Sequence, residues 1–577
     1  MILLLSSLGF AQSTVTVGAS ADRDYERIAD ALQLAGEDLQ VIELQPDYEN
    51  LEGALSGSGY FACVEVWRSV TIRSSDGEPR SLPCMVVSGD GVTVTVEQGQ
   101  VQPGSSVVAA STYPSNQILA EGTSGVIVRE GATFIGKELE FSGVSGGTFG
   151  TPLQVDSGGL ELYGVSFHGN DFSAAAGYPG AAIVITSSVA DGREWVFQDV
   201  VIEVPEDTTG TGNTGLLVDS VFGSGGVTNS VRIDGLTVTG AEIGYEAGRS
   251  FGSAVFLSGV DSVAEGVQVV EAEGNAIYLL DGGHSWSDVS VTGVDGGAFY
   301  AVDASLAISG GVFRDVDADY GAVVKSTDGE ALILKGIRVE GASAKAGGVV
   351  YAEGLGQVVD LVNGRFCSVG SDSGSLFEVR DGGLRMQNSV LRQVSGPGLN
   401  VDGSLELVNN TFYQLDDALI DSSPSSLWFV NNAVVDVNRL RSDLVGVVDN
   451  FSYNLLDGLV VSITEAGLEL GEGNLIDTPP EFESAFAAAD QDCAVDPVPA
   501  EGSPLVDNGS PEIQDPDGGL SDIGAFGGPN AEVWGGEGGG TGSVSGSGVT
   551  LMGGCGESGG SAALLLLPLL LLGRRRD

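Results

Sequence analysis

Apolar and polar residues alternate over short segments that recur along the chain. The clearest examples are LRMQNSVL (residues 384–391), LELVNNTF (405–412) and LWFVNNAV (427–434). In each segment an asparagine breaks the alternation, at Asn388, Asn409 or Asn431. Alternation with a period of two predicts a strand with one buried face, and the asparagine predicts a bend. Because this unit recurs every 21 or 22 residues, the pattern predicts the coils of a solenoid.

The same pattern extends upstream to Phe134. Its predicted bend residues are Glu138, Gly164, Asp199, Gly235, Gly266, Asp288, Gly310, Gly336, Asn363, Asn388, Asn409 and Asn431. The spacing between them has a minimum near 22 residues and widens to 35, 36 and 31 between Gly164 and Gly266. Coils with loop insertions give such spacings, so we expect a binding surface on the extra loops of this upstream stretch.

The residue types at the bends have a conformational explanation. A sharp turn between strands often needs a positive φ, which Gly, Asn and Asp tolerate best. Equivalent residues of stacked coils lie about 4.8 Å apart. We therefore predict an internal ladder of side-chain amides, formed by Asn363, Asn388, Asn409 and Asn431.

The ends of the chain differ from this repeat. Residues 1–12 have the apolar run and small-residue end of a secretory signal. Residues 20–36 predict a helix, with Ile28, Ala31, Leu32 and Ala35 on one face, that covers the first coil. The predicted divisions are a signal-like segment at 1–12, a cap and first coils at 13–110, a solenoid with a closing segment at 111–530, a Gly/Ser-rich linker at 531–561 and a tail at 562–577.

Composition narrows the classes of partner. The 577 residues carry a formal net charge of −55, which disfavours nucleic acid and polyuronates and favours a soluble monomer. The hydrophobic content of 42% is too high for a disordered chain. Cys63 and Cys84 flank a hairpin-like segment, and their spacing predicts a disulfide. The sequence leaves the pairing of Cys367 and Cys493 open.

These repeats resemble the right-handed parallel β-helix of the pectate-lyase-like superfamily, most closely over residues 130–440. The resemblance implies an all-β, right-handed parallel β-helix with a short N-terminal capping helix. The tail resembles the myxobacterial type of C-terminal sorting tag, with Cys555 in a Gly-Cys-Gly, an apolar run, and Arg574, Arg575 and Arg576. This second resemblance implies export, processing near Cys555 and attachment to the cell envelope, at the outer membrane surface or with later release.

Two acidic groups are candidate calcium sites. Arg314 lies beside Asp315, Asp317 and Asp319, and a cationic base near clustered carboxylates is what calcium-assisted lyase chemistry requires. A solvated acidic row on an outer edge is the simpler explanation. The second group, Asp515, Asp517 and Asp522, lies among turn-forming residues and is expected to close the solenoid, with Ca²⁺ as a candidate ligand.

Two functional hypotheses follow, beside the third possibility of a bare spacer with no ligand. The first is a non-catalytic, surface-anchored scaffold that contacts a polysaccharide or matrix ligand. The second is a calcium-assisted polysaccharide lyase or glycoside hydrolase with Arg314 as its catalytic candidate. Only His168 and His284 are present, and no hydrolase, phosphate-loop or dinucleotide motif occurs in a suitable setting. The missing catalytic sets favour the first hypothesis.

Overall fold

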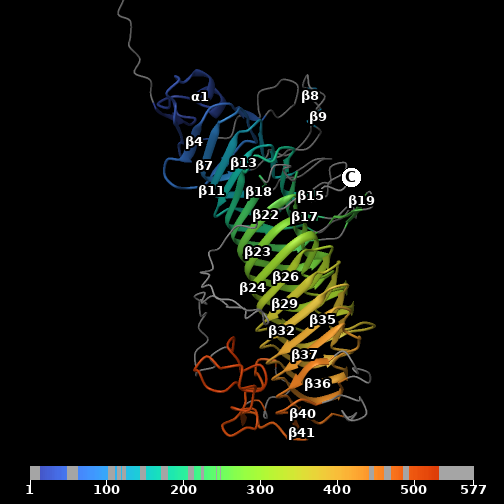
Figure 1. Cartoon of the computed structure of the whole chain (residues 1–577). Coiled ribbons are helices and arrows are strands. Elements are labelled where there is room, and N and C mark those ends of the chain that lie inside the picture. Colours follow the sequence, from blue (N-terminus) through green and yellow to red (C-terminus); the bar gives the residue numbers. More distant parts are fainter. Residues whose placement is uncertain are drawn as a thin grey trace, which may run out of the picture.

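The protein folds as a long right-handed parallel β-helix, seen in the computed structural model of Figure 1. The structure describes residues 13–48, 63–101, 111–112, 118–119, 125–142, 151–170, 180–205, 213–221, 227–241, 244–246, 249–251, 253–440, 448–459, 470–484, 486 and 493–531. Successive coils pair strand on strand in parallel, and the pairing continues from β1 to β41. The fold class predicted from the sequence is therefore confirmed.

Each coil contributes to three parallel sheets. The first sheet contains β1 (Thr14–Val17), β2 (Val41–Leu44), β4 (Val70–Ser74), β13 (Gly159–Tyr163), β29 (Val358–Val362), β32 (Gly383–Gln387), β35 (Ser404–Val408), β37 (Ser426–Val430) and β39 (Val448–Ser452). The second sheet contains β5 (Arg80–Leu82), β14 (Ser166–His168), β30 (Arg365–Ser371), β33 (Val390–Ser395), β36 (Thr411–Ala418), β38 (Ala433–Arg439), β40 (Leu455–Asp457) and β41 (Leu475–Ile476). The third sheet contains β3 (Val64–Val66), β6 (Met85–Val87), β10 (Val126–Arg129), β12 (Leu153–Asp156), β15 (Gly180–Ser187), β17 (Asn213–Ser220), β21 (Ser253–Ser258), β25 (Val324–Thr327), β28 (Val350–Glu353), β31 (Phe377–Arg380) and β34 (Leu399–Val401).

Longer strands turn a corner and join neighbouring sheets. Those shared by the first and second sheets are β7 (Thr93–Val101), β11 (Thr133–Ser142), β16 (Glu194–Glu203), β18 (Asn229–Ala241), β22 (Val260–Glu273) and β26 (Ala331–Glu340). Two strands, β23 (Asn275–Asp295) and β24 (Phe299–Tyr320), pass through all three sheets, and β27 (Ser343–Ala346) pairs with the end of β24. Two antiparallel hairpins project from the coils: β8 (Ser111–Thr112) with β9 (Ile118–Leu119), and β19 (Gly244–Glu246) with β20 (Arg249–Phe251).

Left-handed residues make the corners of the coil. All twelve bend residues predicted from the sequence have a positive φ, between 51° and 80°, so this prediction is confirmed. They separate the first sheet from the second. A second column lies where the second-sheet strands turn toward the third sheet, and its members are Gly240, Glu271, Gly293, Asp315, Gly341, Ser368, Gln393, Gln414, Asp436 and Gly458. Each coil therefore has left-handed residues at fixed positions. These corners keep its strands in register with those of the neighbouring coils.

The core is a continuous column of apolar side chains inside the coils. Rings stack from coil to coil, as in the Phe141–Phe167 and Phe429–Phe451 pairs, whose centroids are 4.6 and 4.9 Å apart. Trp195 and Trp286 are also fully buried there. Because each coil buries its apolar face only against its neighbours, no coil is stable alone, and the stability of the array is built from contacts between adjacent coils.

The N-terminal helix is shorter than the sequence predicts. It covers Ile28–Leu34 (α1) and buries Ile28, Ala31 and Leu32 at the end of the solenoid (Figure 1). The residues before it form a loop because their polar side chains bind strands of the first coil. Asp24 accepts hydrogen bonds from the backbone and hydroxyl of Thr16, at 2.8 and 3.0 Å. Local side-chain bonds of this kind compete with the helix.

The predicted amide ladder is wrong by one residue. Asn363, Asn388, Asn409 and Asn431 occupy the bends, and the last three direct their amides out of the coil. The ladder is formed instead by Asn410, Asn432, Asn454 and Asn474. In this ladder the side-chain oxygens of Asn432, Asn454 and Asn474 each accept from the amide of the preceding member, at 3.0, 3.4 and 3.0 Å. Each oxygen also accepts from the preceding backbone N–H at 2.8–3.0 Å.

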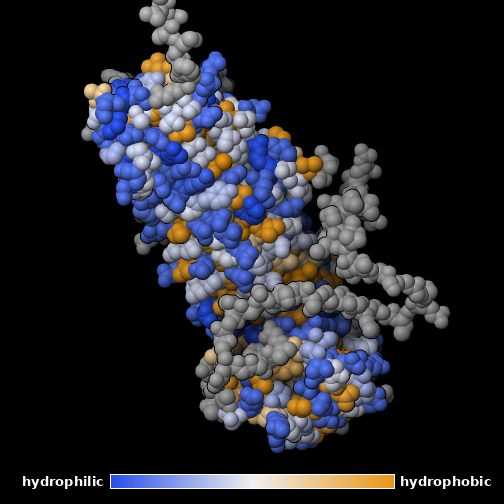
Figure 2. Space-filling model, turned by 90° about the vertical axis from the view of Figure 1, so that its left-hand side faces the viewer, coloured by the Kyte–Doolittle hydropathy of each residue, from blue (hydrophilic) through white to orange (hydrophobic). Residues whose placement is uncertain are grey.

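The bend asparagines hold the closing segment, which we define as residues 493–531. The amide of Asn388 donates to the carbonyl of Ala525 at 3.1 Å, and that of Asn409 donates to Asp522 O at 2.9 Å. Both Asn409 and Asn431 donate to the Ser521 hydroxyl at 3.1 Å. This segment forms the red lobe in Figure 1 and the lower lobe of Figure 2, whose visible surface is largely hydrophilic.

Apolar packing supports the same contact. Leu505 and Ile523 of the closing segment are buried against Ala433, Val435 and Leu455, on the outer face of the second sheet. The segment therefore covers the last coils of that sheet, where the outward side chains are apolar. The acidic turn predicted to close the solenoid lies within it.

Two disulfides tie the chain. Cys63 is bonded to Cys84 with an S–S distance of 2.12 Å, which is the pairing expected from their spacing. Cys367 of β30 is bonded to Cys493 at the start of the closing segment, 126 residues away. The second pairing links two segments that only the tertiary structure brings together.

Candidate functional site

A row of aromatic side chains lies on the outer face of the third sheet. Phe256, Tyr278, Tyr300, Lys325 and Tyr351 occupy equivalent positions of five successive coils. Their strand neighbours point inward and are fully buried, so alternation places these five side chains on the outside. With neighbouring strands about 4.8 Å apart, the row is about 19 Å long. We call these five residues, together with Tyr320, the aromatic row.

The rings of the aromatic row contact one another. The centroids of Phe256 and Tyr278 are 5.2 Å apart in a stacked pair, and those of Tyr278 and Tyr300 are 4.9 Å apart at a steep angle. Tyr320 packs against Tyr351 at 5.0 Å and is 45% exposed. Phe256 and Tyr351 are nearly buried, so the accessible centre of the row is formed by Tyr278, Tyr300 and Tyr320.

Lys325 lies between these rings. Its Nζ is 4.2 Å from the centre of the Tyr300 ring and 5.4 Å from that of Tyr320. Contacts of this type are favourable by about 0.5–1 kcal/mol at exposed sites. Among the described residues Lys325 makes no ion pair, although the chain has 79 acidic side chains. Its ammonium is thus held by the faces of two aromatic rings, and its N–H groups can donate hydrogen bonds to a ligand.

The end of the aromatic row is fixed by charged groups. Tyr351 donates to Glu353 at 2.9 Å, and Arg380 binds Glu378 at 2.6 Å while lying 5.0 Å from the Tyr351 ring. Burial and the bond to Glu353 raise the pKa of Tyr351 to about 12. The phenol therefore remains protonated at neutral pH, where it can donate a hydrogen bond but cannot act as a base.

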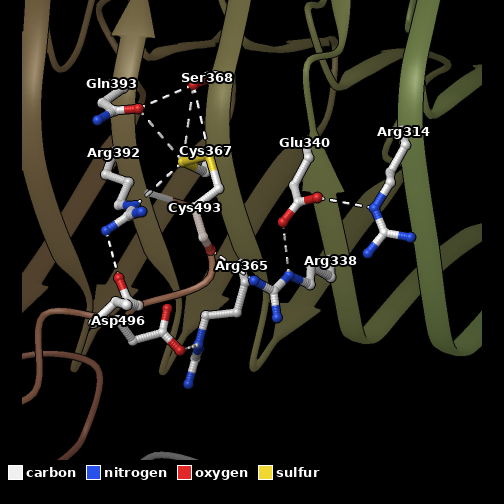
Figure 3. Close-up of polar contacts among 11 residues, drawn as sticks. Arg314, Arg338, Glu340, Arg365, Cys367, Ser368, Arg392, Gln393, Cys493 and Asp496 are labelled. Carbon is white, nitrogen blue, oxygen red and sulfur yellow. Dashed lines mark hydrogen bonds and ion pairs between the residues drawn. A yellow bond between two sulfur atoms is a disulfide. The ribbon is translucent and has the colours of Figure 1, made fainter. Parts of the chain in front are cut away.

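Arg314 lies on the second sheet, in the region of Figure 3. Its Nε is 2.9 Å from Glu340, and Arg338 binds the same carboxylate at 3.1 Å. Burial opposes ionisation of Glu340, but the hydrogen bonds and charges of the two arginines outweigh it and lower the pKa of this carboxyl. The structure therefore gives Arg314 an ion pair, which does not favour the role of catalytic base.

The acidic residues beside Arg314 are separated by the corner of the coil. Asp315 is itself a bend residue with a φ of 51°. Asp317 accepts from the Ser343 hydroxyl, and Asp319 pairs with Lys345. Within the described residues there is no group of three or more His, Cys, Asp or Glu that could hold a metal ion. Asp317 and Asp319 are therefore each bonded to a side chain of the next coil, while Asp315 forms the corner.

The second acidic group builds the turn of the closing segment. Asp515 accepts from the backbone of Asp522 and of Gly528, and Asp517 accepts from Gly519 N at 2.8 Å. Asp522 accepts from Asp507 N at 2.8 Å. Burial, with Asp515 and Asp507 nearby, raises the pKa of Asp522 to about 6. These bonds give the group the closing role expected from the sequence.

His284 is a core residue. It is 3% exposed, and its ring nitrogens lie 2.8 Å from the Ser262 hydroxyl and 2.9 Å from Asp281 O. Burial lowers the pKa of His284 to about 4, so the imidazole is neutral at physiological pH. His168, by contrast, is exposed beside Glu140 at 3.1 Å.

Several sequence predictions fall outside the described residues. These are the signal-like segment 1–12, the linker and tail with Cys555, Arg574, Arg575 and Arg576, and most of the loops inserted between Gly164 and Gly266. No helix in the described part of the chain is long and apolar enough to cross a membrane.

Sequence reasoning missed the aromatic row, although a signal for it exists. Phe256, Tyr278 and Tyr300 are spaced by 22 and 22 residues, and Lys325 and Tyr351 follow at 25 and 26. These intervals are those of the coils themselves. The pattern could have been found by tracking aromatic residues at the coil period, separately from the bend residues.

Comparison with known proteins adds little beyond the fold. No protein-family model matches the sequence, and no curated protein matches it. Among solved structures, the chain is similar to the A-module of a mannuronan C-5 epimerase from Azotobacter vinelandii. The identity is 12% and the TM-score 0.16, over 68% of this chain and 89% of the module. At this level the likeness carries no inference about activity, and the strand pairing itself shows that the chain is a parallel β-helix.

Proposed function

We propose that this protein is an exported, surface-anchored β-helix that binds a glycan along the aromatic row without altering it chemically. The observation that carries the proposal is the row itself, with accessible tyrosine rings and the ammonium of Lys325 on a rigid sheet. Amphipathic rings offer apolar contact to the faces of sugar rings, while their hydroxyls donate and accept hydrogen bonds. A regular sheet supplies such groups at a fixed spacing, which suits a repeating polymer.

The ligand class follows from charge. A chain with a net charge of −55 repels polyuronates and other polyanions, so a neutral polysaccharide is the partner that the surface favours. Lys325 then serves as a hydrogen-bond donor to sugar hydroxyls. The sorting-tag resemblance of residues 562–577, with processing near Cys555, supports anchoring at the cell envelope as part of the same proposal.

The absence of catalysis is also part of the proposal. Arg314, the candidate base, is paired with Glu340, and the phenol of Tyr351 in the aromatic row stays protonated at neutral pH. Incubation of the purified chain with a polysaccharide panel, with and without calcium, tests this point. Unsaturated or reducing-end products that disappear in Arg314→Ala would establish the lyase or hydrolase alternative instead.

Binding is tested by titrating the purified chain with neutral oligosaccharides in a calorimeter. We expect Tyr300→Ala to weaken the affinity about three- to tenfold, because one ring contact contributes about 0.5–1.5 kcal/mol. Trp428→Ala is the matched control, since Trp428 is 43% exposed on the first sheet. Equal losses in both variants, or no binding by the wild-type chain to any neutral glycan, would refute the proposal.

A further inference from the structure

The Cys367–Cys493 disulfide has a cation at one of its two sulfurs. Arg392 Nε lies 3.2 Å from Cys367 Sγ, and the Arg392 side chain is only 1% exposed (Figure 3). The guanidinium is fixed on its other sides, with Nη1 2.5 Å from Val495 O and the Phe486 ring centre at 5.4 Å. A positive charge held at this distance stabilises a thiolate more than a thiol, so it favours Cys367 as a leaving group.

The two sulfurs differ in exposure. A groove of about 420 Å³, lined by Ser368 and Gln393 among others, lies next to the disulfide. The Ser368 hydroxyl is 3.6 Å from Cys493 Sγ and 3.9 Å from Cys367 Sγ, so the wall of the groove contacts both sulfurs. Cys493 is partly exposed, whereas Cys367 is only 5% exposed. A small thiol can therefore approach Cys493 more readily than Cys367.

From these two observations we infer that Cys367–Cys493 is a site of thiol–disulfide exchange with a small-molecule thiol. The thiolate of the small molecule attacks Cys493 Sγ, and the protein S–S bond breaks with its electron pair leaving on Cys367 Sγ, beside Arg392. A mixed disulfide on Cys493 results. A second thiolate then attacks the small-molecule sulfur, releasing Cys493 as a thiolate and forming the oxidised small-molecule disulfide. In sum, two thiols are oxidised and one protein disulfide is reduced to two thiols.

The Cys63–Cys84 disulfide of the same chain serves as an internal control. Among the described residues no cationic side chain hydrogen-bonds to Cys63 or Cys84, so that disulfide lacks the feature that activates the other one. The consequence for the closing segment is specific. Reduction removes its covalent link, and residues 493–496 are then held only by non-covalent contacts, such as those of Arg338 with Cys493 O at 2.6 Å and of Arg365 with Asp496 at 3.6 Å.

The inference is tested by incubating the full chain with glutathione, quenching with acid and mapping the peptides. Peptide mapping also distinguishes an adduct on Cys555 from one on Cys367 or Cys493. We expect the early adduct on Cys493 and not on Cys367. The redox buffers contain a small dithiol and its disulfide. The ratio of dithiol to disulfide at which half of Cys367–Cys493 is reduced should be at least tenfold lower than the ratio needed for Cys63–Cys84. For this two-electron couple a tenfold ratio corresponds to about 30 mV. An adduct on Cys367, or the same ratio for both disulfides, would overturn the inference.

Variants at Arg392 show whether this residue activates the Cys367–Cys493 disulfide or only anchors the closing segment. Arg392→Gln should make the disulfide harder to reduce, removing most of the tenfold difference, while Arg392→Lys keeps most of it. If Arg392 only anchors the segment, Arg392→Gln loosens the segment and makes reduction easier, which is the opposite sign. Arg385→Gln, at a half-exposed arginine of the first sheet, is the control and should leave the ratio unchanged. If Arg392→Gln fails to fold, the position of the adduct in the wild-type chain, on Cys493 or on Cys367, still tests the inference.

Discussion

Neighbouring residues in this chain have opposite roles at the corner of each coil. Asn409 has a φ of 53° and directs its amide to the closing segment, whereas Asn410, the next residue, is fully buried and joins the ladder. The same division holds for Asn431 and Asn432. A left-handed bend residue points its side chain away from the coil, and the following residue returns to the inside. One position along the chain therefore decides between an internal amide and an external one.

We predict that Asn432→Ala destabilises the protein by about 2–4 kcal/mol. The substitution removes bonds from Asn432 Nδ2 to Leu407 O at 2.8 Å and Val430 O at 3.1 Å. It also leaves the buried Asn410 N–H without its acceptor, and an unsatisfied buried group costs about 1–3 kcal/mol. Denaturant unfolding measures the change. Asn438→Ala, which removes a solvent-exposed bond to Asp416 O, should cost under about 0.5 kcal/mol, and equal losses would contradict the prediction.

The bends could be predicted from the sequence because their requirement is local. Only a few residue types tolerate a positive φ, so the position of Gly, Asn or Asp after an alternating run is informative. The ladder could not be placed in the same way. Asn409–Asn410 and Asn431–Asn432 are adjacent pairs of identical residues, and only the path of the chain through the corner shows which member enters the stack.

At the scale of elements, the closing segment acts as a cover for one sheet. Its apolar residues Leu505 and Ile523 cover the outward apolar positions of the last coils, and its carbonyls accept from the bend asparagines. The sequence predicted that the acidic turn closes the solenoid. It could not predict the contact, since Asn388 and Ala525 are 137 residues apart and no short-range pattern relates them.

We predict that Asp522 weakens this cover as the pH rises. The folded pKa of about 6 lies above the value of about 4 for an unfolded Asp, so the folded state binds more protons between these pH values. Stability contributed by this group is therefore complete below about pH 4 and is lost as the pH rises through about 6. Asp522→Asn should raise the melting temperature relative to wild type more at pH 7 than at pH 4.5.

The pH comparison requires a control from the same closing segment. Glu501→Gln changes an exposed carboxylate of this segment that is not among the charges raising the pKa of Asp522, so it should shift the melting temperature equally at both pH values. If the Asp522 variant differed from wild type by the same amount at both pH values, the raised pKa of Asp522 would not govern the closing segment.

The aromatic row shows what limits prediction of the candidate site. Its members recur at the coil period, so the sequence contains them, but Phe299 and Tyr300 are adjacent and only one belongs to the row. Phe299 points inward and packs on Trp286 at 5.5 Å, while Tyr300 points outward toward Lys325. The alternation of a strand fixes the two faces only after its register is known. That register is marked by a further set of left-handed residues, among them Asp281, Asp303 and Asp328 at the ends of third-sheet strands, which lie outside the series of twelve predicted bends.

At the scale of the whole molecule, the aromatic row and the closing segment occupy different faces of the solenoid and overlap only where the row ends. The aromatic row lies on coils between Phe256 and Tyr351, and the closing segment contacts coils from Arg338 onward on a different face. A repeat array is stabilised mainly by contacts between neighbouring coils. A perturbation at the covered end should then decay with distance along the axis.

We therefore predict a local effect of Asn409→Ala on hydrogen exchange. The variant loses bonds to the Ser521 hydroxyl and Asp522 O, so the closing segment should exchange faster, followed by β36 and β38, which lie beneath it. Protection in β16 and β18 should stay unchanged. These strands lie many coils away, and the perturbation would have to pass through every coil between. Mass spectrometry of exchanged peptides resolves these regions. An equal rise along the whole chain would mean that the coils unfold as one cooperative unit, and would contradict the prediction.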